Sequence, residues 1–186
     1  MASELDIWNL ALQKLGVERL SSTTQNHRNA RSCAACYETT RDAELEKYRW
    51  TFAITRTVLS PDASAPAFDF TYKFQVPSDC LRVLLPPDTE LDWVIENGYI
   101  LTNYGDTLNV RYIARVTDTS RFTPTFVKAL AMKMAEDMCE ELTQSNQKKA
   151  DAQATYKDAI AEARRTNAIE KISAGPPEDP WLYARR

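Results

Sequence analysis

The sequence of 186 residues is poor in several features on which particular protein classes depend. Its four glycines form no glycine-rich loop of the kind that cradles phosphate groups. No apolar run approaches the ~18–20 residues that a membrane-spanning helix needs. The first six residues lack a basic stretch followed by an apolar core, so we expect no secretory signal. The sequence therefore predicts neither a phosphate-binding loop nor a membrane span, and we expect the chain to fold in a cytoplasm.

Charge and cysteine content narrow the possibilities further. The formal net charge is −3 and no long basic block is present, so the chain lacks the electrostatic pattern of a dedicated nucleic-acid binder. The four cysteines (Cys33, Cys36, Cys80 and Cys139) lie in segments that read as core. A chain of this length in a reducing compartment does not need disulfides to fold. With 44% hydrophobic and 26% charged residues, the composition is typical of a globular protein.

Periodicity predicts helices at both ends of the chain. Ser3 is suited to cap a first helix, whose apolar residues recur at spacings of three and four until Gly16 supplies a stop. A second helix is expected from about Arg28 to Tyr48. Later, Thr123 is a good cap and precedes a proline that suits the first helical position. A further, mostly polar helix follows a break at residues 143–146.

Alternating apolar and polar residues dominate the middle of the chain. This pattern, rich in aromatic and β-branched residues, is typical of half-buried strands. Asn97 and Gly98 separate two such runs and are a strong signal for a two-residue hairpin turn. Strands are expected at about residues 50–59, 70–76, 81–85, 93–96, 99–102 and 108–116.

These patterns predict an α+β fold that is mainly α. We expect an antiparallel bundle of four helices, formed by residues 1–49 and 118–175. A small antiparallel β lobe at residues 50–117 is expected to be inserted into it. Residues 176–186 follow a proline-rich stretch and are predicted to be an extended C-terminal docking tail.

The usual candidates for catalytic or metal sites favour structural interpretations. Cys33 and Cys36 have the spacing of half a zinc or redox site, but no second pair completes a tetrahedral set of ligands. They lie in a helical pattern whose inner positions require small apolar residues, and a buried free cysteine is such a residue. His27 is the only histidine and lies in a polar segment without a nucleophile motif beside it. We therefore expect no metal ion and no cofactor.

The acidic residues Asp137, Glu140 and Glu141 lie on or near one helix surface and alternate with core methionine and leucine. A glycosidase instead needs two carboxyl groups that face each other across a substrate. A solvated helix face is the better interpretation. We therefore predict no catalytic residues and a protein that is not an enzyme.

Two other features favour contacts rather than chemistry. Arg41 falls on or beside the apolar stripe of the second helix, so we expect it to be paired with an acidic group or a backbone carbonyl between the helix and the β lobe. We expect Arg41 and Asp42 to take part in a structural ion pair. The end of the chain, from Trp181 to Arg186, combines aromatic and basic residues beyond a proline-rich linker. We expect that such a segment does not fold alone. The alternatives are a frayed tail and a segment that docks onto a partner.

The order of segments along the chain is also informative. The segments that carry a resemblance begin with Leu5–Gly16 (LDIWNLALQKLG). They continue with Tyr37–Asp42 (YETTRD) and Tyr48–Ala53 (YRWTFA). Later segments are Tyr72–Leu84 (YKFQVPSDCLRVL) and Val110–Asp118 (VRYIARVTD). They are followed by the helix that ends at Ala163, Arg164 and Arg165. In this order the chain resembles the podovirus tail tubular protein A family, the phage head-to-tail adaptors (connectors). The likeness covers about residues 4–168.

The resemblance implies a structural virion protein at the head–tail interface, assembled in the host cytoplasm. Family members form a homo-oligomeric ring, dodecameric in the family pattern, between the portal protein and a tail nozzle or other tail protein. Genomic DNA passes through the channel without specific binding, and no membrane is involved.

The residues expected to bind the portal are Trp181, Leu182, Tyr183, Arg185 and Arg186. The alternatives are a virion-associated cell-wall hydrolase, with Asp137 or Glu141 in a cleft, and a soluble interaction domain.

Overall fold

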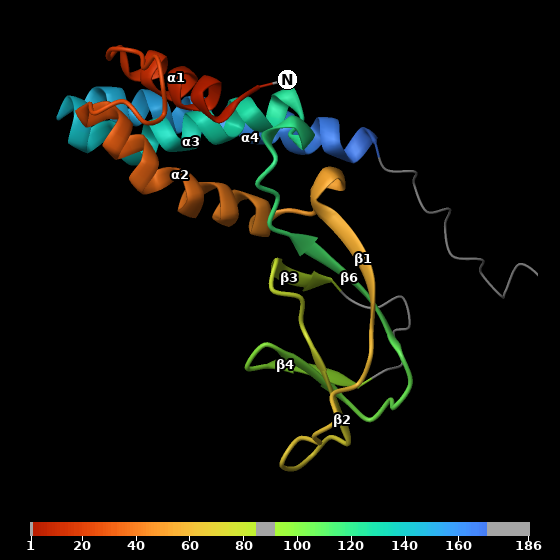
Figure 1. The fold of residues 1–186 in the computed structure, drawn as a ribbon. Coiled ribbons are helices and arrows are strands. Elements are labelled where there is room, and N and C mark those ends of the chain that lie inside the picture. Colours follow the sequence, from red (N-terminus) through yellow and green to blue (C-terminus); the bar gives the residue numbers. More distant parts are fainter. Residues whose placement is uncertain (1, 85–91, 171–186) are drawn as a thin grey trace, which may run out of the picture.

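The structure is a computed structural model that describes residues 2–84 and 92–170. Figure 1 shows a layer of helices at one end and strands in an arm that extends away from it. The helical layer contains α1 (Glu4–Leu15), α2 (Arg28–Lys47), α3 (Pro124–Thr143) and α4 (Asn146–Ile169). Among the described residues, no helix is long and apolar enough to cross a membrane.

The predicted helix ends are confirmed where a local signal marked them. The Ser3 hydroxyl caps α1 and forms a capping box with Asp6, whose carboxylate accepts from the Ser3 backbone N–H. Gly16 ends this helix with a φ of 67°, in the left-handed region that favours glycine. Thr123 caps α3, and Pro124 occupies its first turn. These ends depend on neighbours within a few residues, so the sequence alone identifies them.

The helices pack around α3 as a shared centre. Helix α3 contacts α1, α2 and α4, and the rings of Trp8 on α1 and Tyr37 on α2 meet edge-on. Nearly every turn of α3 is therefore buried, including Phe126, Leu130 and Met134. The four helices therefore form a layer around α3.

The strands form two sheets rather than one. The first contains β1 (Ile54–Leu59), β6 (Leu108–Ala114) and β3 (Cys80–Leu84), in that spatial order. The second contains β2 (Tyr72–Gln75), β5 (Tyr99–Thr102) and β4 (Trp93–Glu96). All neighbouring strands are antiparallel. We call residues 54–84 and 92–114 the β arm, and the sheet β2-β5-β4 its distal sheet.

The predicted fold class is wrong in treating the strands as one small inserted lobe. Two three-stranded sheets are present, and strands make up 19% of the described residues against 51% in helices. An α+β architecture remains consistent with the structure. Alternation identifies a strand but not its partner, and β1 pairs with β6 across about fifty residues. The expected strand at residues 50–53 is instead a short 3-10 turn (Thr51–Ala53) that leads into β1.

Two separate hydrophobic cores explain the elongated shape. The two faces of sheet β1-β6-β3 carry alternate residues of each strand. On one face, Ile113 and Leu84 join the core of the helical layer. On the other, Val110 and Leu108 join a second core with Phe74 and Ile100 of the distal sheet. The first sheet thus connects the helices to the distal sheet through both of its faces.

The predicted hairpin between β4 and β5 is confirmed. Asn97 and Gly98 have φ angles of 49° and 77°, the two positive values of a type I′ turn. This turn matches the twist of the flanking strands, which places Trp93 of β4 opposite Thr102 of β5. The hairpin supplies two of the three strands of the distal sheet.

Candidate functional site

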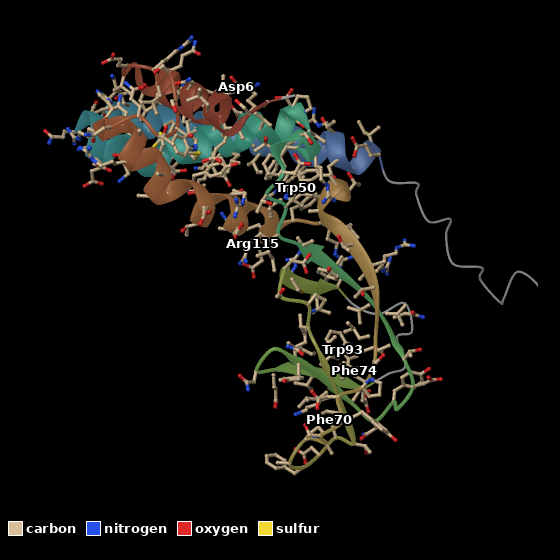
Figure 2. The ribbon with its side chains drawn as sticks, viewed as in Figure 1. Asp6, Trp50, Phe70, Phe74, Trp93 and Arg115 are labelled. Carbon is tan, nitrogen blue, oxygen red and sulfur yellow. The ribbon has the colours of Figure 1, made fainter. Side chains whose placement is uncertain are left out.

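An ionic cluster joins the helical layer to the β arm. Asp42 on α2 binds two arginines: Arg41 Nη2 lies 2.8 Å from Oδ1, and Arg115 Nε donates to Oδ2 at 2.7 Å. Arg115 follows β6, so the Asp42 carboxylate connects α2 to the returning strand. Figure 2 shows Arg115 beside the end of α2, where the arm begins. The cluster therefore helps to set where the arm leaves the helices.

Arg41 is the buried member of this cluster. The residue is only 4% exposed, and its guanidinium carbon lies 5.6 Å from the centre of the Tyr37 ring. Its Nε also donates to Asp42 Oδ1 at 2.9 Å. A buried arginine needs such a carboxylate, because an unpaired charge in the interior is costly. The structure thus brings together the predicted residues Arg41 and Asp42, and it adds Arg115, which no local pattern marked.

Aromatic side chains fill the joint between layer and arm. Trp50 is fully buried, and its ring centre lies 4.9 Å from that of Phe126 and 6.0 Å from that of Phe52. The indole Nε1 donates to the carbonyl oxygen of Glu44 at 2.9 Å. Figure 2 shows Trp50 directly beneath the helices, where the arm starts. Nearby, the Asn167 amide bonds the backbone on both sides of Trp50.

Glu44 is a buried carboxylate with structural partners. The Tyr156 hydroxyl lies 3.0 and 2.9 Å from its two oxygens, and Lys47 Nζ lies 2.5 Å from Oε1. Burial and the nearby Glu44 charge raise the pKa of Tyr156, so the phenol keeps its proton and can donate it to the carboxylate. These bonds connect α2 to α4 and leave Glu44 little capacity to act on a substrate.

The cysteines are free thiols in packed surroundings. None of the four forms a disulfide. Burial raises the pKa of Cys33 to about 12 and that of Cys36 to about 11. Since the thiolate is the nucleophile and the metal ligand, both groups are protonated and unreactive near neutral pH. Within the described residues, no group of three His, Cys, Asp or Glu side chains is arranged to hold a metal ion.

The other catalytic candidates also have structural contacts. His27 caps α2, and its Nδ1 accepts from the Asn29 N–H at 3.2 Å. Asp137 lies 2.8 Å from Lys133 Nζ and accepts from Thr40 on α2. The remaining two carboxylates are bound in the same way: Glu141 accepts from Ser32 at 2.6 Å, and Glu140 lies 2.9 Å from Lys149 Nζ. These bonds hold α2 and α4 against α3.

Two surfaces of the β arm remain without partners in the described chain. The first is the arginine pair, Arg56 on β1 and Arg111 on β6, which lie directly opposite each other. They line a shallow groove together with Val58 and Asn109. The second consists of the distal sheet and the loops that adjoin it, where large apolar side chains are exposed. They are Ile95 (44%) and Val94 (40%) on β4, and Phe68 (77%) and Tyr104 (40%) in the loops. Figure 2 shows that Phe70 also lies at this far end of the arm.

Sequence reasoning missed both of these surfaces. Strand alternation identifies which residues share a face only after the pairing is known, so neither the arginine pair nor the exposed distal residues were predicted. The predicted portal-binding residues Trp181, Leu182, Tyr183, Arg185 and Arg186 lie outside the described residues.

Comparisons with known proteins assign no family to this chain. No protein-family model matches the chain, and no curated protein matches it.

Proposed function

We propose that this chain is a structural subunit of a phage virion, a head-to-tail adaptor that assembles into a ring between the portal and the tail. The observation that carries the proposal is the elongated arm. Its first sheet is anchored to the helices by Asp42 and Trp50, and its far end exposes Phe68, Val94 and Ile95. A chain that spans two assemblies needs contact surfaces at separated ends, and exposed apolar side chains typically serve such contacts.

The bonding of the polar residues supports a structural role. Asp137 and Glu141 connect α3 to α2 through Thr40 and Ser32. Within the described residues, no observation favours the cell-wall hydrolase over the adaptor. A mildly acidic chain also suits a ring around passing DNA, because it avoids the many Lys and Arg contacts to phosphate that slow release.

The proposed contacts divide between the two ends of the chain. The distal residues of the β arm bind one neighbouring component, and the C-terminal residues 176–186 bind the portal. The aromatic side chains of Trp181 and Tyr183 supply apolar area, and Arg185 with Arg186 supplies charge. Aromatic and arginine side chains are enriched among the residues that dominate binding energy.

Deleting residues 176–186 is expected to abolish binding to the portal while leaving the fold intact. The two hydrophobic cores described above are formed by residues within 2–84 and 92–170, so we expect circular dichroism and the melting temperature to match the full chain. Co-sedimentation with purified portal rings measures the binding. The variant Trp181→Ala/Tyr183→Ala, of full length, is expected to lose most of it. Unchanged co-sedimentation of the deletion would contradict the assignment of this segment.

A further inference from the structure

The arginine pair has the properties of an unsatisfied contact surface. Two like charges directly opposite on neighbouring strands destabilise a sheet. Neither Arg56 nor Arg111 has an ion pair among the described residues, and Arg111 Nε is buried without a hydrogen-bond partner. Val58, on the same face and two residues along β1, is 60% exposed.

A complementary surface lies on α2. Glu38 and Glu46 are both exposed, lie two helical turns apart on one face, and border a groove that also contains Asp42 and Arg115. Asp42 is neutralised by its two arginines. Glu38 and Glu46 have no ion pair or hydrogen bond in the described chain. We call them the acidic stripe; by helix rise their Cα atoms are roughly 12 Å apart, within the combined reach of two arginine side chains.

The helix that carries the acidic stripe and the strand that carries Arg56 lie on different sides of the joint (Figure 1). In the sheet β1-β6-β3, the edge strand β3 contacts α2, whereas β1 is the other edge. Figure 1 shows α2 and β1 on opposite sides of the joint. In the described chain neither arginine forms an ion pair with Glu38 or Glu46, so the arginine pair and the acidic stripe are free to meet between copies. A head-to-tail contact of this kind repeats from copy to copy, and it generates a ring when the rotation between copies closes.

We propose that the arginine pair of one copy binds the acidic stripe of the next copy. The inference rests on the proposed function, since it names the contact between neighbouring subunits of the ring. Arginine forms bidentate bonds with carboxylates, which would neutralise both the arginines and the free glutamates. An exposed valine beside the charges fits a protein surface better than a nucleic-acid backbone, because protein contacts combine arginine with apolar area.

The test is a charge exchange in the full chain, with self-association measured by sedimentation velocity. Arg56→Glu/Arg111→Glu and, separately, Glu38→Arg/Glu46→Arg are expected to weaken association by about 100-fold, because like charges then face each other. Combining all four substitutions restores the opposite charges and is expected to recover most of the association. The control Lys14→Glu/Arg19→Glu has the same charge change as the arginine variant on exposed residues elsewhere and should associate like the wild type.

If the double arginine variant does not fold because Arg111 is half-buried, Arg56→Glu alone tests the same contact. Arg56 is exposed, so its substitution leaves the fold intact. The proposal is overturned if either charge-reversed pair associates normally, if the fourfold variant fails to recover, or if the wild-type chain remains monomeric at every concentration. Loss of binding to duplex DNA in the arginine variant, with association unchanged, would assign the surface to nucleic acid instead. If the arginine variant still forms a ring on the portal, this contact is wrong but the adaptor proposal stands. If the wild-type chain does not bind the portal, the adaptor proposal is wrong.

Discussion

Replacing Trp50 with alanine is expected to lower the free energy of unfolding by about 3–5 kcal/mol, the usual cost of removing a large buried aromatic side chain. Trp50 has no exposed surface and packs against Phe52 and Phe126, at the joint of the helical layer and the β arm. The cavity would separate α3 from the start of β1. The melting temperature should fall by about 10 °C, which differential scanning calorimetry can measure.

The variant Trp50→Phe separates packing from hydrogen bonding. It keeps an aromatic ring but removes the indole N–H that donates to the Glu44 carbonyl. We expect a loss of about 1–3 kcal/mol, smaller than that of the alanine variant. If both variants unfold like the wild type, the aromatic joint does not hold the arm to the helices.

Replacing Asp42 with alanine is expected to lower the free energy of unfolding by about 3 kcal/mol, because it leaves the buried Arg41 without its carboxylate. The same change releases Arg115, so α2 also loses its ionic connection to the strand β6. Chemical denaturation measures the loss. The β arm should open relative to the helices, which small-angle scattering detects as a larger radius of gyration.

Arg115→Gln is the matched control for this cluster. The Arg115 side chain is 46% exposed, so solvent screens its ion pair and the expected loss is only about 0–1 kcal/mol. Arg41 keeps its partner in this variant. An equal effect of the two substitutions would show that the buried pair with Arg41 is not the stabilising part of the cluster.

Local features of this fold could be predicted from the sequence. The cap at Ser3, the start of α3 at Thr123 and the turn at Asn97 and Gly98 each depend on side chains within a few residues. The conflict between the Arg41 charge and the apolar stripe around it also indicated that Arg41 needs a partner, and Asp42 stands next to it. These features required no knowledge of the tertiary structure.

Features that depend on distant pairing could not be predicted. The division of six strands into two sheets follows from β1 pairing with β6, which alternation does not encode. Arg115 reaches Asp42 across 73 residues, and no motif marks it. The arginine pair becomes visible only when the register places Arg56 opposite Arg111. The single small lobe predicted from the sequence was wrong for the same reason.

Electron microscopy of the purified chain mixed with portal rings tests the central claim most directly. The adaptor account predicts one additional ring stacked coaxially on the portal, with an open channel through its centre and the β arms at a separate level from the helices. Portal rings that remain bare at saturating concentrations of the chain would contradict it.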